Sequence, residues 1–569
     1  MTARRWEYSA RLADSMVAEL AESLHLSPVV ASLLLQREIC TAEGANSFFY
    51  PLPTAIHDPF LFTGMDIAVA RILLARDRKE RIAIYGDNDV DGLTAIALLT
   101  RYFVSLGIDV TPYIPQRSDT SYGLHEEGID ELKRIGIKLI VTVDVGTTAI
   151  NASRHAKFAE VDLIITDHHE PGPVLPEALA VLNPKLPGST YPFRELSGCA
   201  MAFKLAQAVE IKLHGEEATF PFLELVALGT VADIVPLVEE NRALLSLGLA
   251  AFKETSIAGL TALCELAGVD MTAVGVDDLL MTLSPRINAA SRMGNPYRAL
   301  QLLLCDQAQE AGQLAVAIEQ DNFKRRVMDD TMMRDAIETL HQQFIPDSDA
   351  AIVLAKPGWH LGVIGILASR IAEMYHRPTV VLAVENGLGR GSARTVNGID
   401  IHAALTACKD NLVQYGGHRC AAGLTIAEDE IPAFTERFKK FVADAVSEDQ
   451  LKPKLMIDAE LPLDQIDYSL YRELQLLSPF GPGNPKPAFF AGKVEVVGNT
   501  KVVGQKHLRF KIRQRNKVFS AIALGMADRY HELNGNRSII DVCFGVDHSA
   551  NNWDNPIHLR VFDFRPTKP

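Results

Sequence analysis

The sequence predicts an α/β protein of several domains that ends in a β-rich domain. Between residues 81 and 170, short apolar runs alternate with helical stretches, which is typical of βαβ units around a parallel sheet. Residues 297–345 are charged and amphipathic over a length that indicates long helices. After residue 489, short strands and turns predominate and favour a small β-barrel or sandwich.

These patterns divide the 569 residues, too many for one core, into five segments. A helical segment, 1–45, precedes a parallel-sheet domain, 46–296, and connecting helices, 297–345. A smaller α/β domain follows over 346–450, and a β-barrel domain over 451–569. The first segment contains "WEYSARLADSMVAEL", which we expect to be amphipathic helix and to which we assign no function.

The composition is that of a globular protein, with 48% hydrophobic and 22% charged residues. No apolar run reaches the roughly 18 residues needed to span a membrane, and the charged start "MTARRWEYSARLADSMVAEL" does not resemble a signal peptide. The seven cysteines are scattered and form no CxxC, which favours a reducing, cytoplasmic setting. A net charge of −15 argues weakly against nucleic acid as a partner, but the local charge of a groove matters more.

Each early predicted strand ends in side chains that bind metals. The groups that follow these strands, with one from a later segment, are Asp87, Asp89, Asp144, Asp167, His168, His169 and Asp233. Ligands bind beyond the carboxyl ends of parallel strands, and neighbouring strand tips lie about 5 Å apart, so we expect these groups to converge. Carboxylates with imidazole suit Mn²⁺ or Mg²⁺, and shared carboxylates suit a pair of ions about 4 Å apart.

Other interpretations of "GDNDVDG" can be weighed from the sequence. An EF-hand loop is excluded, because the twelfth position counted from Asp87 is Leu98 and not glutamate. An aspartyl-phosphate phosphatase that uses Asp89 and Asp91 stays open as the second choice, although it leaves the paired histidines unused. Any single aspartate could instead cap the helix that follows it.

A basic pattern marks the last domain. In "RFKIRQRNK", cations stand at every second position: Arg509, Lys511, Arg513, Arg515 and Lys517. If this stretch is one strand, all five side chains point to one face and, near His507, form a stripe that follows phosphates. The alternative is an ordinary solvated face of a sheet.

The chain resembles the DHH phosphoesterase superfamily and, within it, the RecJ single-stranded-DNA exonucleases, from about residue 45 onward. The motifs that carry the resemblance include "GDNDVDG", "IPQRSDTSYGL", "VTVDVGTT", "TDHH", "ALGTVADIVPL", "PRINAASRMG", "GSARTVNGIDI", "GGHRCAAG" and "PFGPGNPKPAF". The resemblance implies a parallel-sheet DHH domain, joined by a long helix to a smaller α/β DHH-associated domain, then an OB-fold-like β-barrel.

The resemblance also implies the roles of individual residues. The implied ligands of two Mn²⁺ or Mg²⁺ ions are Asp87, Asp89, Asp144, His168 and Asp233. Asp144 and His168 would also count as catalytic, and His169 would help the leaving oxygen or the attacking water beside the scissile phosphate. The chain departs from the superfamily pattern at Tyr85, where some members have histidine, a possible metal ligand.

Further residues are assigned to substrate binding. "GSAR" offers small residues, a hydroxyl and a guanidinium, which suit a terminal phosphate. The resemblance implies that Ser392, Arg394 and Arg117 grip a 5′ phosphate, and Tyr122 is grouped with them. On its own "GGH" is typical of a turn before a helix. The resemblance makes Gly417 and His418 part of a substrate loop.

Two arginines of "PRINAASR" have alternative roles. Arg286 and Arg292 could contact the nucleic-acid backbone, or they could tie the connecting helix to the sheet domain. The same stretch carries Ser291 where the family usually has glycine, and "GDNDVDG" carries Asn88 in place of an aromatic residue.

The resemblance implies an exonuclease that degrades single-stranded DNA from 5′ to 3′ into mononucleotides by two-metal hydrolysis, in recombination and repair. Single-stranded DNA is the implied partner, with single-strand-binding protein and a helicase as further expected partners. Two alternatives stay open. Hydrolysis of short oligonucleotides or cyclic dinucleotides is less favoured because such relatives lack the C-terminal β domain, and a non-catalytic binding protein is favoured only by Tyr85.

Overall fold

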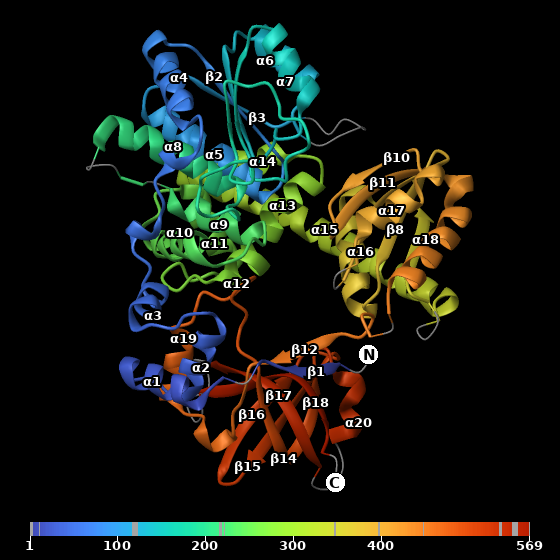
Figure 1. Cartoon of the computed structure of the whole chain (residues 1–569). Helices are drawn as coiled ribbons and strands as arrows, with labels where there is room; N and C mark the ends of the chain where they lie inside the picture. Colours follow the sequence, from blue (N-terminus) through green and yellow to red (C-terminus); the bar gives the residue numbers. More distant parts are fainter. Residues whose placement is uncertain are drawn as a thin grey trace. The chain divides into compact units, whose positions relative to one another are not determined.

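The computed structural model describes residues 4–10, 12–115, 123–215, 219–220, 222–345, 349–396, 399–447, 449–533, 538–548 and 556–567. The chain divides into two compact units. Figure 1 shows the helices and strands of the chain coloured along the sequence. We call Thr41–Asn322 with Leu476–Lys486 the sheet unit. We call Met1–Cys40, Phe323–Gln475 and Pro487–Pro569 together the composite unit.

A five-stranded, all-parallel sheet organises the sheet unit, in the order β3-β2-β4-β5-β6. Its strands are β2 (Ile82–Gly86), β3 (Val110–Tyr113), β4 (Leu139–Val143), β5 (Asp162–Thr166) and β6 (Ala180–Leu182). Both β2 and β4 are buried along their whole length, because helices cover both faces of the sheet. The register aligns Gly86 with Val143 and Val143 with Thr166, so these three strands end side by side.

Side chains alternate between the two faces of this sheet. Ile82 and Ile84 pack into the larger core, whereas Ala83 and Tyr85 pack into the smaller one. The helices of the sheet unit are α3 (Ala42–Phe49), α4 (Met65–Arg78), α5 (Val90–Ser105), α6 (Glu126–Arg134), α7 (Ile150–Phe158), α8 (Gly198–His214), α9 (Leu223–Ala232), α10 (Glu239–Ala251), α11 (Ala258–Ala267), α12 (Val276–Asp278), α13 (Ser284–Arg292) and α14 (Pro296–Leu304). Helices α4, α5 and α8 contribute to the larger core, and α6 and α7 to the smaller one.

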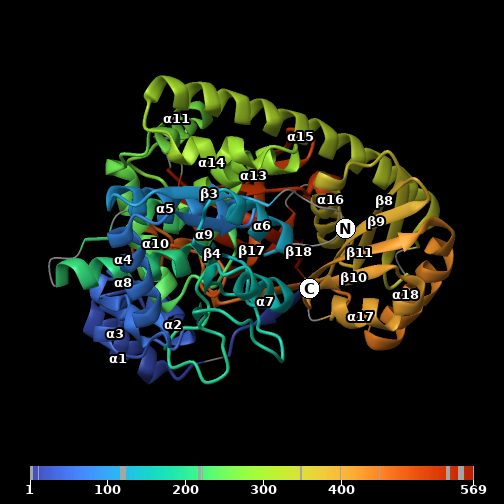
Figure 2. The same cartoon turned by 90° about the horizontal axis from the view of Figure 1, so that it is seen from above.

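A 36-residue helix, α15 (Ala308–Gln343), leads from the sheet unit into the composite unit and is seen along its length in Figure 2. The next part of the chain forms a mixed sheet in the order β10-β11-β9-β8-β7. Its elements are β7 (Ile352–Pro357), α16 (Leu361–Tyr375), β8 (Thr379–Glu385), β9 (Leu388–Arg394), α17 (Ile401–Ala407), β10 (Gln414–Gly417), β11 (Ala421–Ala427) and α18 (Ile431–Ala445).

The C-terminal part is a β-barrel. Strands pair in the order β14-β15-β16-β18-β17, and a further pairing of β14 with β17 closes the ring. The elements of this part are β12 (Lys454–Ile457), β13 (Ala459–Glu460), α19 (Tyr468–Gln475), β14 (Phe489–Val503), β15 (His507–Gln514), β16 (Lys517–Ala523), α20 (Tyr530–Leu533), β17 (Ile539–His548) and β18 (Ile557–Pro566). The predicted fold class, with a parallel sheet, a long helix, a second α/β domain and a barrel, is therefore confirmed.

One local expectation, for the start of the chain, is wrong. The first segment does not start as helix, because Arg5–Tyr8 is strand β1 and pairs in parallel with β12, before α1 (Asp14–Leu24) and α2 (Pro28–Gln36). Trp6 explains this choice, since its indole donates to Asp563 at 2.7 Å and packs edge-on against Phe490. The "GGH" residues lie at the turn between β10 and β11, so the alternative of a turn before a helix is not the one found.

Among the described residues, no single helix combines the length and apolar composition needed to cross a membrane, although two bent helix pairs meet that test by length and composition.

Candidate metal centre

Acidic and histidine side chains follow the three central strands of the parallel sheet. Asp87 comes directly after β2, and Asp144 directly after β4. The "DHH" residues, 167–169, come directly after β5. Because the last residues of these strands are aligned, the groups meet at one edge of the sheet. Asp233, at the end of α9, is added from a separate segment.

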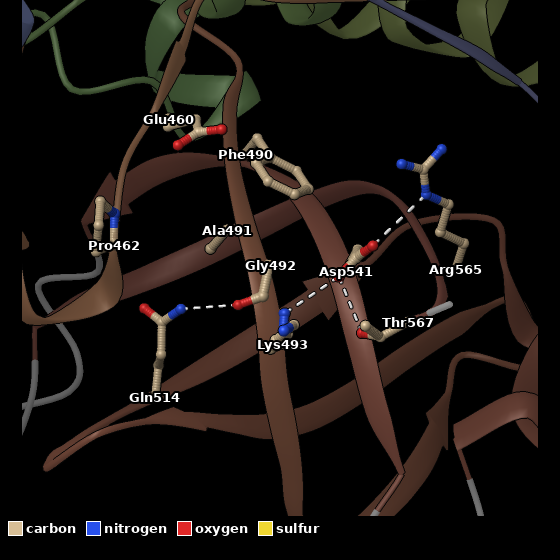
Figure 3. A pocket seen from close by; sticks show the side chains of 10 residues that line it. All are labelled: Glu460, Pro462, Phe490, Ala491, Gly492, Lys493, Gln514, Asp541, Arg565 and Thr567. Atoms are coloured by element: carbon tan, nitrogen blue, oxygen red, sulfur yellow. Dashed lines mark hydrogen bonds and ion pairs between the residues drawn. The ribbon is translucent and has the colours of Figure 1, made fainter. Parts of the chain in front are cut away.

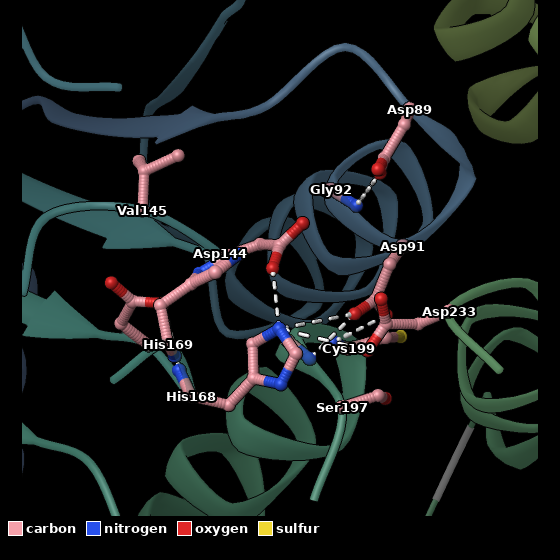
Figure 4. Close-up of polar contacts among 12 residues, drawn as sticks. Asp89, Asp91, Gly92, Asp144, Val145, His168, His169, Ser197, Cys199 and Asp233 are labelled. Atoms are coloured by element: carbon pink, nitrogen blue, oxygen red, sulfur yellow. Dashed lines mark hydrogen bonds and ion pairs between the residues drawn. The ribbon is translucent and has the colours of Figure 1, made fainter. Parts of the chain in front are cut away.

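These side chains form three overlapping groups, and in each group the ligand atoms lie within 4.8 Å of one another. The groups are Asp87 with Asp89 and Asp144, Asp91 with His168 and Asp233, and Asp144 with Asp167, His168 and His169. Nε2 of His168 lies 3.1 Å from Oδ1 of Asp144 and 3.7 Å from Oδ2 of Asp233 (Figure 4). Because Asp144 and His168 each belong to two groups, the arrangement suits neighbouring cations that share ligands.

Two atoms at the centre of the cluster lack hydrogen-bond partners. Oδ1 of Asp144 and Nε2 of His168 are buried, and neither makes a hydrogen bond among the described residues. The His168 ring hydrogen-bonds the backbone of Leu196, so its other nitrogen is the one left to face the carboxylates. Buried polar atoms are rarely left unpaired, and a neutral imidazole held in this way is a typical metal ligand. The donor set therefore fits Mn²⁺ or Mg²⁺.

The electrostatics of the cluster also favour the binding of cations. Burial and the neighbouring carboxylates raise the pKa of Asp144 well above its ordinary value and that of Asp233 to about 8. Burial and the charge of Asp89 raise the pKa of Asp91 to about 7. Burial lowers the pKa of His168 to about 3, so its imidazole is neutral. These carboxylates cannot all ionise near neutral pH unless a cation joins them.

Asp91 has a role that the sequence analysis did not assign. Its carboxylate is buried and accepts the backbone N–H groups of Gly198 at 2.6 Å and Cys199 at 2.8 Å, at the start of α8. It therefore ties α5 to α8 beneath the cluster. A carboxylate held by two amides is poorly placed to act in aspartyl-phosphate chemistry, and that alternative is not supported.

Glycine at 198 is required by space. A Cβ atom there would lie 2.5 Å from Cβ of Asp144, so any side chain would displace this carboxylate. Asp144 itself has φ 61°, in the left-handed region that aspartate tolerates better than most residues. The packing of α8 against the end of β4 therefore fixes where the Asp144 carboxylate lies.

His169 and Asp167 form a pair beside the cluster. Nδ1 of His169 lies 2.7 Å from Oδ1 of Asp167, whose other oxygen accepts the N–H of Thr147 at 2.8 Å. Although burial lowers it, the hydrogen bond and charge of Asp167 raise the pKa of His169 to about 9. The side chain of His169 is 44% exposed. A protonated imidazole thus stands at the rim of the cluster, where an entering molecule can reach it.

Tyr85, the predicted departure from the family pattern, belongs to none of the ligand groups of the cluster. Its hydroxyl donates to the carbonyl of Gly123 at 3.0 Å and accepts the N–H of His125 at 3.3 Å, and its ring stacks on Tyr113. It therefore acts as a core residue of the sheet.

The other two departures touch each other, since the hydroxyl of Ser291 donates to the backbone carbonyl of Asn88. This bond links α13 to the loop that carries Asp87 and Asp89.

The residues assigned to phosphate binding are described only in part. Arg117 and Tyr122 lie outside the described residues. Ser392 and Arg394 lie on β9, and Nη1 of Arg394 donates to Oγ of Ser392 at 2.8 Å and to the carbonyl of Ala393 at 2.9 Å. The hydroxyl and the guanidinium are therefore adjacent, as the binding of one phosphate requires.

The loop with Gly417 and His418 joins β10 to β11. Gly417 has φ 141°, and a Cβ atom there would lie 2.5 Å from the carbonyl oxygen of Ala421, so only glycine fits. The N–H of His418 donates to the same carbonyl at 2.8 Å, which closes the turn. Arg286 ties the connecting helix to the sheet domain, which was the alternative to a contact with nucleic acid. Its Nε lies 2.8 Å from a carboxylate oxygen of Glu319 on α15.

The basic stripe of the barrel is shorter than expected. Arg509, Lys511 and Arg513 are exposed on β15 and alternate with buried apolar residues. The strand ends at Gln514, and Arg515, with φ 53°, forms the turn into β16. The prediction that all five cations lie on a single strand is therefore wrong. Arg515 pairs with Asp464 in the turn, and Lys517 starts the next strand.

The barrel also carries a pocket of about 530 Å³ (Figure 3). Its lining residues are Glu460, Pro462, Phe490, Ala491, Gly492, Lys493, Gln514, Asp541, Arg565 and Thr567. Asp541 accepts the N–H of Lys493 at 3.1 Å and the hydroxyl of Thr567 at 2.9 Å. Oδ2 of Asp541 also lies 3.8 Å from Nε of Arg565, so this carboxylate has partners within the pocket, in contrast to the unpaired atoms of the cluster.

Comparison with known proteins identifies related families and structures. Models of the DHH family N-terminal domain, the DHHA1 domain and the RecJ OB domain match residues 81–230, 348–444 and 457–562. The chain is 37% identical to the single-stranded-DNA-specific exonuclease RecJ of Bacillus subtilis, over 97% of this chain and 69% of that protein. It is 34% identical to the corresponding protein of Salmonella typhimurium, over 89% and 90% of the two chains.

Solved structures agree with these matches. RecJ of Thermus thermophilus in complex with Mn²⁺ superposes with a TM-score of 0.84 at 31% identity, over 99% of this chain and 80% of that chain. The Mg²⁺ complex of the same protein superposes with a TM-score of 0.79 at 29% identity, over 99% and 79%.

Proposed function

Because the chain belongs to the RecJ family of single-stranded-DNA-specific exonucleases, we propose that it degrades single-stranded DNA from the 5′ end and releases mononucleotides. The observation that carries this proposal is the buried cluster at the sheet edge, where Asp144 and His168 present unpaired atoms to each other. The cellular setting that we propose is DNA recombination and repair in the cytoplasm, with a single-strand-binding protein and a helicase as further partners.

Two divalent cations, Mn²⁺ or Mg²⁺, complete the proposed site. Their proposed ligands are Asp87, Asp89, Asp144, His168 and Asp233. When bound, the cations would polarise the scissile phosphate and lower the pKa of the attacking water. The shared membership of Asp144 and His168 in two ligand groups supports a pair of ions rather than one.

The chain's own residues would orient the phosphate and supply a proton. The Leu196 backbone holds the ring of His168 so that its other nitrogen faces the carboxylates. His169, whose pKa is raised by Asp167, keeps its proton near neutral pH. Because Nδ1 is held by Asp167, the proton that passes to the leaving 3′ oxygen would be the one on Nε2 of His169.

Recognition of the 5′ end would use a second set of residues. We propose that Ser392 and Arg394 bind a terminal 5′ phosphate together with Arg117. Gly417 and His418 would form a loop beside the bound DNA strand. On the barrel, Arg509, Lys511 and Arg513 would follow the phosphates of the strand.

The test is digestion of a long single strand labelled at either end, carrying a 5′ phosphate or a 5′ hydroxyl, with Mn²⁺ or with a chelator. We expect early release of the 5′ label as mononucleotide, dependence on Mn²⁺, preference for the 5′ phosphate and resistance of the matching duplex. Release of the 3′ label first, or equal cleavage with chelator, would contradict the proposal.

A further inference from the structure

Ile234 has an unusual backbone conformation next to the cluster. Helix α9 ends at Ala232, Asp233 follows with φ −78°, and Ile234 then adopts φ 60°. This is the position after the helix cap, where chains commonly place glycine because the left-handed region crowds a Cβ atom. A β-branched residue there is an outlier, since its side chain makes the conformation costlier still.

The side chain of Ile234 gains little packing in return. It is 60% exposed, whereas the apolar residues around it in the sequence, Val231, Val235 and Leu237, are all buried. An isoleucine that is both left-handed and exposed is unfavourable on two independent counts. Glycine or asparagine would serve the same turn at lower cost, and packing within the folded chain does not explain the choice of isoleucine.

Ile234 lies next in the chain to a residue of the cluster. It directly follows Asp233, whose Oδ2 lies 3.7 Å from Nε2 of His168 in the cluster. A phosphodiester brought to this cluster carries a nucleoside on each side of the reacting phosphorus. Carboxylates and imidazoles can bind the phosphate through cations, but they offer no contact to the apolar faces of sugar and base.

We propose that Ile234 is a substrate-contacting residue that packs against the nucleoside beside the scissile phosphate. This inference rests on the proposed function and assigns one of its contacts. Because every base and every deoxyribose has an apolar face, the contact tolerates any sequence. In this proposal, the left-handed turn at Ile234 lowers the stability of the fold but places an apolar side chain beside the DNA strand.

The test compares Ile234→Gly and Ile234→Asn with wild type and with Ile234→Leu. We measure affinity for a short single strand in Ca²⁺ by fluorescence anisotropy, KM and kcat with Mn²⁺, Mn²⁺ affinity by calorimetry, and the melting temperature. For Gly and Asn we expect strand Kd and KM to rise by about tenfold, the scale expected when one apolar group no longer packs against the ligand. We expect Mn²⁺ affinity to be unchanged, melting temperature to be equal or higher, and Ile234→Leu to stay near wild type.

Phe158→Ala is the matched control, because Phe158 is 87% exposed and lies at the far end of α7, away from the carboxyl edge of the sheet. Unchanged strand affinity in Ile234→Gly and Ile234→Asn would overturn the inference. So would a parallel loss of Mn²⁺ affinity, since Ile234 would then act by positioning Asp233. Ile234-dependent binding without turnover would preserve the inference and overturn only the proposed function, and no strand binding by wild type would overturn both.

Discussion

The metal cluster of the sheet unit and the basic face of the barrel both concern phosphate, but they are built in opposite ways. The cluster gathers carboxylates and histidines from four segments and buries Asp144 and His168 at its centre, where each keeps an unpaired atom. The basic face is one exposed strand, and Arg513 there is already paired with Glu495 at 2.7 Å. Burial makes each charge of the cluster costly unless a cation is present, whereas water screens each charge of the face.

This difference predicts how strongly a single substitution in each region should change activity or DNA binding. A buried group that shares a cation with its neighbours cannot be replaced by water, so the loss of one carboxylate should disable the whole cluster. A surface cation contributes one phosphate contact among several, so its loss should weaken binding in small steps. We therefore expect the effects of substitution to decrease from the first kind of group to the second.

Asp144→Asn should cause the largest loss. Asparagine keeps the size of the side chain and tolerates φ 61°, but it removes the carboxylate that two ligand groups share. We expect kcat to fall by about 10³-fold or more, with the melting temperature of the metal-free protein unchanged or raised because a buried repulsion is lost. Steady-state hydrolysis of single-stranded DNA and thermal unfolding measure the two effects.

Asp109→Asn provides the control, because Asp109 is an exposed carboxylate of the same unit, paired with Arg81 at 3.2 Å. It should leave both quantities unchanged. If Asp144→Asn kept most of the activity, the shared role of this carboxylate would be wrong.

Asp167→Asn should have an intermediate effect that depends on pH. Asp167 raises the pKa of His169 to about 9, so His169 keeps its proton through neutral pH and loses it only in alkali. Without this carboxylate the pKa should fall toward its ordinary value, and the alkaline limb of the kcat profile should move to lower pH. We expect a loss of about 10- to 100-fold near pH 8, as for other groups that orient a reacting residue.

Asp130→Asn is the matched variant, because Asp130 holds Nε2 of His155 at 2.8 Å elsewhere in the sheet unit. Its pH profile should overlay that of wild type. An unshifted alkaline limb in Asp167→Asn would show that the proton of His169 is not used.

Replacing Arg509, Lys511 and Arg513 together by alanine should have the smallest effect on chemistry. We expect kcat on a short DNA strand to be unchanged and KM on a long DNA strand to rise by about three- to tenfold. The slope of the logarithm of the binding constant against the logarithm of the salt concentration should become less negative by about 0.7 for each phosphate that is no longer neutralised. Strand affinity measured over a range of salt concentrations checks this. The exposed triple Lys133, Arg134 and Lys138 should give no such change when replaced by alanine. An equal salt slope in both triples would refute a strand-binding role for this face.

Much of the cluster could be predicted from sequence because strand tips in a parallel sheet converge. Asp87 and Asp144 follow β2 and β4 directly, so apolar runs and their last residues were enough to bring them together. Asp233 joins them by tertiary packing of α9, which no local pattern describes, so the sequence offered it only as a further carboxylate from a later segment, and the resemblance gave its role as a ligand. The support from Asp91 was missed for the same reason, since its partners at the start of α8 are more than 100 residues away.

The errors have local physical causes. The alternation through Arg515 and Lys517 suggested one strand, but the chain turns there, and alternation continues across a turn without marking it. The segment with Trp6 looked helical by periodicity, yet hydrogen bonding to Asp563 and pairing with β12 decide for a strand. A turn decided the first case and distant partners decided the second, and periodicity reports neither.

The central claim, that the buried cluster is a cation site, is tested most directly by calorimetric titration of Mn²⁺ across pH, followed by thermal unfolding. The pKa of Asp233 is raised from 3.8 to about 8, so the folded metal-free protein binds protons that the unfolded chain does not. The contribution of Asp233 to the stability of the metal-free fold is fully present below pH about 4, and it is lost as the pH rises through about 8 and the carboxylate ionises.

Because Mn²⁺ competes with these protons, its affinity and its effect on melting temperature should both grow from about pH 5.5 to about pH 8. We predict two Mn²⁺ per chain at pH 8, with proton release on binding, and neither in Asp144→Asn. Absence of saturable binding at pH 8, or the same titration in Asp144→Asn, would contradict the account.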